Sequence, residues 1–228
     1  MDKAQRWLDK KLNYRFEDEG LLQQALTHRS ASGINNERLE FLGDAVLDFV
    51  ISDALFALYP DADEGDLSRL RASLVRDASL GPIAEQLGIG EHLILGSGER
   101  KSGGHRRESI LADAIEAIFG AVYLDSGFDA ARQLIESLFA TRLDNLPHVD
   151  ELRDPKTRLQ EWLQARREAL PNYELEDVSG KAHRQRFTVS CAVRDGEVRS
   201  LGEGTSRRNA EQQAAERVLE LLKAGESR

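Results

Sequence analysis

The sequence predicts two domains of different class: an all-α domain over residues 1–146 and a small α+β domain over residues 154–224, joined by a linker at 147–153. Long segments without Pro and with apolar residues three and four apart predict helices in the first part. Two prolines and a drop in apolar content in DNLPHVDELRDP (144–155) mark the linker. Strict alternation in QRFTVSCAV is typical of a strand.

Composition bounds the class of protein. Apolar residues make up 40% of the 228 residues, which is enough for a core. No run approaches the roughly 18 apolar residues of a membrane span, and the first residues lack the apolar stretch of a signal peptide, so we expect a cytoplasmic protein with no membrane partner. The single cysteine, Cys191, excludes an internal disulfide and a Cys-based zinc site.

The net charge of −9 is unevenly spread along the chain. Residues 154–228 carry 14 Lys and Arg against 13 Asp and Glu, which leaves 17 against 27 in residues 1–153. An acidic first part followed by a charge-balanced second part with clustered arginines suggests two separate tasks. The whole-chain charge therefore does not exclude a nucleic-acid partner.

The first part reads as a series of helices. We expect them at 5–13, 19–27, 36–59 (stopped by Pro60), in two segments of 67–88 with their joint at Gly81-Pro82, and at 108–127 and 128–143, with an acidic turn at 61–65. The segment 96–108, GSGERKSGGHRRE, reads as a basic Gly/Ser loop with no P-loop pattern. It is either a plain loop or a phosphate contact. His28 is either a ligand or a polar residue at a helix end.

The helix over 36–59 carries an acidic stripe opposite an apolar face. At 100° per residue, one arc holds Glu37, Glu40, Asp44 and Asp48, and the opposite side holds Leu39, Leu42, Val46, Phe49 and Val50. Like charges one turn apart repel, so the stripe is either a solvated face or part of a cation site. Phe41 projects beside the carboxylates, where a partner subunit is the simplest cover for it.

The helix over 108–127 is apolar almost all round, yet it contains Asp113 and Glu116 on one face. Two carboxylates in a buried helix are costly unless they are paired or coordinated. A structural carboxylate pair is one interpretation, and a metal site is the better one. Together with Glu40 and Asp44 they form an oxygen-only ligand set, which suits Mg²⁺ or Mn²⁺ and phosphodiester chemistry.

The second part predicts the order α-β-β-β-α, with two helices on one face of a small sheet. Asp154-Pro155 starts a helix over 155–169 with Leu159, Trp162 and Leu163 inward, and Asp195-Gly196 forms a hairpin turn. Ser206 caps a final helix, with Ala210, Ala214, Val218 and Leu222 inward. Arg207 and Arg208 lie in its first turn, where they form an anion site with the free N–H groups or are solvated.

These motifs resemble bacterial ribonuclease III over nearly the whole chain. NERLEFLGDAVL resembles the signature of that family, ALTHRS the segment before it, and DAIEAIFGAVYLD its second carboxylate helix. SGKAHRQRFTV with GEGTSRRNAEQQAA resembles its double-stranded-RNA-binding domain. The resemblance implies an all-helical endonuclease domain that forms a homodimer, with the RNA lying between two composite sites.

The resemblance also assigns roles by position. Glu40, Asp44, Asp113 and Glu116 match the metal ligands, with Asp44 and Glu116 catalytic, Glu37 and Glu64 match auxiliary acidic positions, and Phe41 matches an aromatic of the dimer interface. Gln160, Glu161 and His183 match minor-groove contacts, Arg207 and Arg208 match contacts to phosphates, and Lys181 assists. Such a domain reads the shape of A-form RNA through 2′-OH and phosphate.

The sequence therefore predicts a Mg²⁺-dependent endonuclease that cuts both strands of double-stranded RNA. The resemblance implies 5′-phosphate and 3′-hydroxyl ends with 3′ overhangs, and a role in processing ribosomal RNA precursors and some messenger RNAs. The rival is a non-catalytic adaptor for double-stranded RNA, which does not need four carboxylates. A DNA nuclease is disfavoured by the domain that reads 2′-OH groups.

Overall fold

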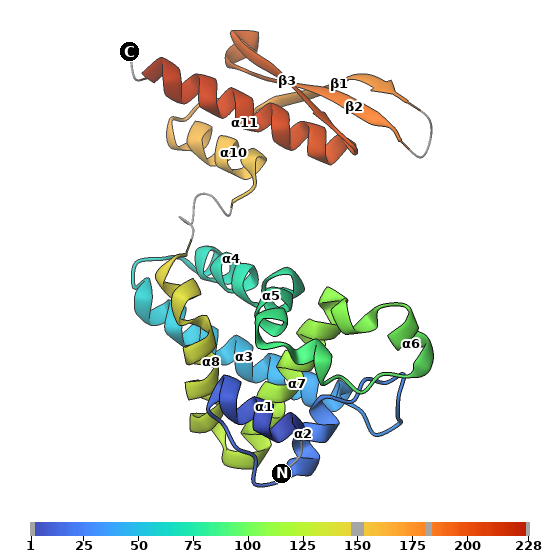
Figure 1. Ribbon diagram of the computed structural model, residues 1–228. Helices are drawn as coiled ribbons and strands as arrows, with labels where there is room; N and C mark the ends of the chain where they lie inside the picture. Colours follow the sequence, from blue (N-terminus) through green and yellow to red (C-terminus); the bar gives the residue numbers. More distant parts are fainter. Residues whose placement is uncertain (1–2, 147–152, 181–183, 227–228) are drawn as a thin grey trace. The chain divides into compact units, whose positions relative to one another are not determined.

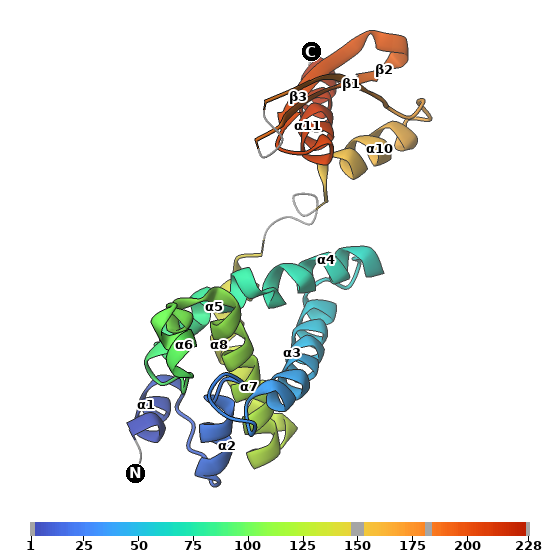
Figure 2. The same cartoon turned by 90° about the vertical axis from the view of Figure 1, so that its right-hand side faces the viewer.

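The computed structural model describes residues 3–146, 153–180 and 184–226. The chain divides into two compact units, Met1–Pro147 and His148–Arg228, and each is described by itself (Figures 1 and 2). The predicted linker at 147–153 falls almost wholly outside the described residues. Among the described helices, none combines the length and the apolar character that crossing a bilayer requires.

The first unit is helical, as predicted. Its elements are α1 (Lys3–Leu12), α2 (Glu19–Ala25), α3 (Glu37–Leu58), α4 (Glu64–Val75), α5 (Asp77–Leu87), η1 (Ile89–Glu91), α6 (Ser97–Lys101), η2 (Gly104–Arg106), α7 (Glu108–Ser126) and α8 (Phe128–Asp144). The apolar helix α7 is the centre of the unit, with eleven of its residues buried. It contacts α2, α3, α5 and α8.

The most extensive helix contact described in this unit is between α3 and α7, which lie side by side in both views (Figures 1 and 2). Two glycines make this approach possible. A Cβ on Gly43 would lie 1.8 Å from the Glu116 carbonyl oxygen, and a Cβ on Gly120 would lie 2.2 Å from the Leu39 carbonyl oxygen. Neither backbone leaves room for a methyl group, so Gly43 and Gly120 set the distance between the two helices.

The predicted joint at Gly81-Pro82 is wrong, because both residues lie inside α5. The helices α4 and α5 instead meet at Arg76, whose backbone is extended (ψ 154°). Pro82 is the sixth residue of α5 and removes one bond of the helix ladder, the one that an N–H at this position would donate to the Ala78 carbonyl. Gly81 serves packing, since a Cβ at this position would lie 2.5 Å from Cγ of Glu108.

Two further expectations for this unit need correction. The segment 96–108 is not a plain loop, because it contains the one-turn helix α6 and the 3₁₀ turn η2. Phe49 does not belong to the buried face of α3: its side chain is 59% exposed and packs edge-on against Phe128, with 5.4 Å between ring centroids. Leu39, Val46 and Val50 are buried as predicted.

The second unit has the predicted order α-β-β-β-α. Its elements are α10 (Pro155–Ala165), β1 (Asn172–Ser179), β2 (Arg186–Val193), η3 (Arg194–Gly196), β3 (Val198–Gly204) and α11 (Arg207–Glu226). The three strands form one antiparallel sheet in the order β1-β2-β3, with Leu175 opposite Val189 and Ser190 opposite Leu201. Both helices cover the same face of the sheet (Figure 2).

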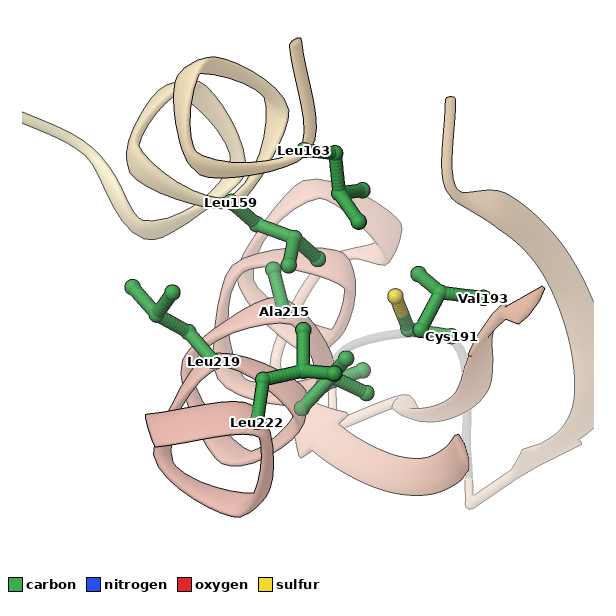
Figure 3. Packing of buried hydrophobic residues seen from close by; sticks show 9 residues of the cluster. Leu159, Leu163, Cys191, Val193, Ala215, Leu219 and Leu222 are labelled. Carbon is green, nitrogen blue, oxygen red and sulfur yellow. The ribbon is translucent and has the colours of Figure 1, made fainter. Parts of the chain in front are cut away.

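The core of this unit lies between the helices and that face (Figure 3). Leu159 and Leu163 come from α10, Cys191 from β2, and Ala215 and Leu219 from α11, and all five are buried. The alternation of β2 therefore places its apolar side chains as the sequence predicts. The helix α11 approaches β3 closely at Gly202, where a Cβ would lie 2.2 Å from the Ala210 carbonyl oxygen.

The ends of the helices follow their capping residues. Asp154 accepts a hydrogen bond from the Thr157 N–H (3.1 Å), and Ser206 Oγ accepts one from the Asn209 N–H (3.2 Å), as predicted. The helix α10 ends at Ala165 rather than at residue 169. Arg167 adopts a left-handed conformation (φ 58°), and the Glu168 N–H donates to the Leu163 carbonyl (2.9 Å), which is a Schellman ending.

Candidate active site

The crossing of α3 and α7 brings carboxylates from both helices together. Glu40 lies one turn before Gly43 on α3, and Glu116 lies one turn before Gly120 on α7, so both side chains leave the helices where the backbones touch. Carboxylate oxygens of Glu40, Asp113 and Glu116 all lie within 4.8 Å of one another. Three half-buried oxygen donors at this spacing are a ligand set for a hard divalent cation.

The pKa values of this acidic cluster (Glu40, Asp113 and Glu116) are raised. Burial, and after it the charges of Asp44, Glu40 and Asp113 in that order, together raise the pKa of Glu116 to about 8. Burial is also the main cause of the raised pKa values of Glu40 and Asp113. Without a cation, the cluster therefore retains at least one proton near neutral pH.

The other predicted acidic residues lie at different distances from this cluster. Asp44 is outside the 4.8 Å group, although its charge is the largest electrostatic contribution to the raised pKa of Glu116. Glu37 lies one turn before Glu40 and borders the same pocket as Glu40 and Asp113. Glu64 is not brought to the cluster in this chain, since it starts α4 and accepts a hydrogen bond from Ser68 Oγ (3.0 Å).

A pocket of about 480 Å³ adjoins the cluster and was not foreseen from the sequence. Glu40 and Asp113 line it, together with Asn36, Arg29 and Arg107. We call it the Asn36 pocket. Its basic side chains come from the segment before α3 and from the basic segment 96–108. The sequence indicated the second segment only as a candidate phosphate contact. His28 also lines it, and its Nδ1 lies 2.8 Å from Ser30 Oγ.

The outer face of α3 exposes aromatic side chains. Phe41 is 79% exposed, and Phe56 is 73% exposed near the far end of the helix. Phe49 and Phe56 line a second pocket of about 650 Å³ between α3 and α4, which also includes Glu64 and Arg71. A row of exposed aromatic side chains on one helix is typical of a protein–protein contact.

The candidate RNA-binding residues of the small unit are partly described. Gln160 and Glu161 lie on α10, where Glu161 forms an ion pair with Arg153 (2.6 Å). Lys181 and His183 lie outside the described residues. Arg207 and Arg208 are exposed in the first turn of α11, as predicted.

Arg207 belongs to a network that the sequence analysis missed. Glu211 lies one turn further along α11 and accepts hydrogen bonds from Arg207 Nε (2.9 Å) and from Lys156 Nζ of α10 (2.6 Å). The same ammonium group lies 4.3 Å from the centroid of the Tyr173 ring. Burial alone would raise the pKa of Glu211, but the hydrogen bonds from Lys156 and Arg207 lower it. The i, i+4 spacing of Arg207 and Glu211 was the available signal.

Comparisons with known proteins agree with this division of the chain. A family model described as Ribonuclease-III-like matches residues 18–143, and a model described as Double-stranded RNA binding motif matches residues 155–222. Ribonuclease 3 of Dechloromonas aromatica is 57% identical over 215 residues, covering 94% of this chain and 97% of the relative. Ribonuclease 3 of Aliivibrio fischeri is 51% identical over 222 residues, covering 97% and 100%.

Solved structures give the same result for the helical unit. The nuclease domain of ribonuclease III from Campylobacter jejuni, solved at 2.2 Å, is 45% identical, with a TM-score of 0.58 over 64% of this chain and 99% of that chain. A second structure of that domain, described by its flexibility in a region involved in dimer formation, has 47% identity and a TM-score of 0.56, covering 59% and 97%. The chain belongs to the ribonuclease III family.

Proposed function

We propose that this chain is a Mg²⁺-dependent endoribonuclease that cuts both strands of double-stranded RNA as a homodimer. The observation that carries this proposal is the convergence of Glu40, Asp113 and Glu116 within 4.8 Å at the α3–α7 crossing. A unit that matches a double-stranded-RNA-binding motif follows in the same chain. A binder alone has no use for a carboxylate such as Glu116, whose pKa is raised by burial and by the neighbouring carboxylates.

The donor set fits a hard cation. All three side chains offer oxygen, and the raised pKa of Glu116, about 8, reflects burial and neighbouring negative charge that a bound cation would offset. Glu40, Asp113 and Glu116 would hold it, with Asp44 on the next turn of α3. A divalent cation there supplies Lewis-acid stabilisation of phosphate oxygens and lowers the pKa of water. Mg²⁺ is the proposed ion, and Mn²⁺ substitutes for it.

The reaction is hydrolysis of a phosphodiester. Water forms the new P–O bond, the bond from phosphorus to the 3′ oxygen breaks, and that oxygen takes a proton. The products are a 5′-phosphate and a 3′-hydroxyl end. Asp44 and Glu116 are the catalytic carboxylates of the proposal.

The small unit is the proposed RNA-binding part of the chain. Arg207 and Arg208 would contact phosphates, and Gln160 and Glu161 would contact the minor groove. Lys181 and His183 are proposed for the same surface from the family pattern alone. The expected substrates are precursors of ribosomal RNA and some messenger RNAs, cut in the cytoplasm to give 3′ overhangs.

The decisive experiment is cleavage of a perfect RNA duplex with and without Mg²⁺ by the wild type and by Glu116→Gln. We expect cleavage only by the wild type and only with the metal, whereas Glu116→Gln binds the duplex with unchanged affinity. Glu85→Gln is a control, because Glu85 is an exposed carboxylate on another helix, α5. A wild type that binds but does not cut in Mg²⁺ or Mn²⁺ would establish the adaptor function instead.

The homodimer is tested through Phe41, which is 79% exposed in the single chain. Burying such a side chain in a partner contributes about 2 kcal/mol, so Phe41→Ala should shift sedimentation toward monomer at micromolar concentration. Leu124→Ala is a control with another exposed apolar side chain, on α7. A Phe41→Ala protein that sediments like the wild type contradicts this interface.

A further inference from the structure

We propose that the Asn36 pocket binds a backbone phosphate of the cleaved RNA strand, one that neighbours the phosphate attacked at the acidic cluster. This inference rests on the proposed function and extends it to residues outside the carboxylates. Glu40 and Asp113 belong both to the cluster and to the lining of this pocket, so the two are contiguous. A strand with one phosphate at the cluster therefore has another within reach of the pocket.

The first argument is a buried donor without a partner. Asn36 is 2% exposed, and its Nδ2 has no hydrogen-bond partner among the described residues. Asn36 precedes α3, but its side chain does not cap that helix, because its backbone is already helical (φ −82°, ψ −14°). A buried N–H₂ group without an acceptor is costly. A phosphate oxygen in the pocket that Asn36 lines is a suitable acceptor.

The second argument is the N-terminus of α7, a helix of 19 residues. No side chain caps it, and its first ladder bond runs from the Leu111 N–H to the Arg107 carbonyl (3.0 Å). Residues of its first turn, Ser109 and Ile110, line the pocket. The N–H groups before that bond have no acceptor within the helix and, with the helix dipole, favour an anion.

The third argument is a pair of arginines on the pocket lining. Arg29 lies 3.5 Å from a Glu37 oxygen, and Arg107 lies 2.9 Å from a Glu99 oxygen. Both arginines are about half exposed or more, so these ion pairs are weak and exchange readily with a phosphate. A guanidinium group that leaves a carboxylate can bind a phosphate through two N–H groups.

The charges of the pocket explain why the arginines are needed there. Glu37, Glu40, Glu99 and Asp113 all line it and would repel a phosphate. Arg29, Arg107 and the α7 N-terminus are the features of the lining that oppose this repulsion. Loss of one arginine should therefore weaken the contact markedly, whereas loss of Glu99 should not.

The test uses duplex RNAs in which one phosphate near the cut site is replaced by a neutral methylphosphonate, one position at a time. We expect one neighbouring position at which the wild type loses about tenfold in cleavage rate. Arg107→Gln should cut the unmodified duplex about tenfold more slowly and show no further loss at that position. Arg29→Gln should behave alike with a smaller effect, since its side chain is 71% exposed.

Two control variants separate phosphate binding from a structural ion pair. Arg106→Gln removes an exposed arginine next to Arg107 that does not line the pocket, and it should keep the wild-type pattern. Glu99→Gln breaks the same ion pair as Arg107→Gln but keeps the arginine, so it should retain the wild-type sensitivity at the neutral position. If Glu99→Gln reproduces Arg107→Gln, the pair is structural and the proposal fails.

The failure of this proposal is distinct from failure of the enzymatic function. Suppose that the wild type cuts the duplex and that Arg107→Gln loses as much cleavage rate as the wild type at each methylphosphonate position. The proposed phosphate contact is then wrong, although the enzymatic function stands. If the wild type cuts no duplex, the enzymatic proposal fails. Fluorescence anisotropy of the same duplexes without metal then tests phosphate binding in the pocket. Arg107→Gln, but not the control variants, should bind the unmodified duplex and the methylphosphonate duplex with equal affinity.

Discussion

The two units of the chain arrange their charged groups in opposite ways. In the helical unit, Glu40, Asp113 and Glu116 share one sign, and burial raises the pKa of each. In the small unit, Glu211 is bound by Lys156 and Arg207, whose hydrogen bonds lower its pKa against the effect of burial. The first arrangement is complete only with an added cation. The second is already neutralised, so RNA must compete with an internal carboxylate for Arg207.

The largest effect is expected where the two halves of the acidic cluster are joined. In Gly43→Ala the new Cβ would lie 1.8 Å from the Glu116 carbonyl, so α3 and α7 must separate. We expect a loss of about 3 kcal/mol or more in the free energy of unfolding, together with loss of Mn²⁺ binding. Urea unfolding and calorimetry measure the two. Gly98→Ala is the control, because nothing lies within 4 Å of its Cβ position, and an equal loss there would refute this reasoning.

The second prediction concerns the raised pKa of Glu116. The folded protein releases this proton at about pH 8, against a usual value of 4.5, so the metal-free protein should lose stability as pH rises between these values. Glu116→Gln removes that loss. At pH 8 its free energy of unfolding should be about 2 kcal/mol higher than that of the wild type, after allowance for solvent screening. Urea unfolding from pH 5 to pH 8 in a chelator measures the difference.

Glu85→Gln replaces an exposed carboxylate on α5 and serves as its control. If the free energy of unfolding depends on pH equally in Glu116→Gln and in the wild type, the pKa of Glu116 is not raised in the folded protein. Added Mg²⁺ should reverse the order at pH 8, because only the wild type retains the full ligand set.

The third prediction applies the same test to the small unit, with the opposite sign. Because the pKa of Glu211 is lowered in the fold, its stabilisation is present above pH 4.5 and is lost as pH falls. Glu211→Gln should cost about 1 kcal/mol at pH 7 and progressively less toward pH 3. Chemical unfolding monitored by Trp162, which packs against the core of this unit, measures the change. Glu216→Gln, an exposed carboxylate on α11, should show no such loss.

The smallest predicted effect separates two neighbouring arginines. Arg207 is paired with Glu211, whereas Arg208 has no ion pair among the described residues. Arg208→Ala should therefore weaken duplex binding about threefold more than Arg207→Ala and lower the salt slope by about one phosphate. Anisotropy titrations at several salt concentrations measure both quantities. Equal slopes for both variants and the wild type would mean that neither arginine contacts phosphate.

The sequence predicts much of the fold because periodicity and capping residues are local. The bounds of α3 and α7, the α-β-β-β-α order and the caps at Asp154 and Ser206 all follow from neighbouring residues. The errors arise where a residue serves a distant contact. Gly81 looks like a helix break, but it provides space for Glu108. Phe49 looks like a core residue by its helical angle, yet its side chain stays 59% exposed at the edge of the Phe128 ring.

The acidic cluster was predicted as residues but not as geometry. That Glu40 meets Asp113 and Glu116 depends on Gly43 and Gly120, which are 77 residues apart and which no local pattern connects. The signal was a glycine inside each of two otherwise strong helices, one turn after an acidic residue. The Asn36 pocket could not be predicted at all, since its lining comes from three separate segments.

The single cysteine gives the small unit its own stability probe. Cys191 is fully buried on β2 beneath the two helices, and its pKa is raised by that burial. A thiol reagent can therefore reach it only when this sheet opens. The rate of labelling in the intact chain measures opening of the RNA-binding unit alone, whatever the state of the metal cluster. Adding duplex RNA should slow that labelling, which would report binding without any engineered label.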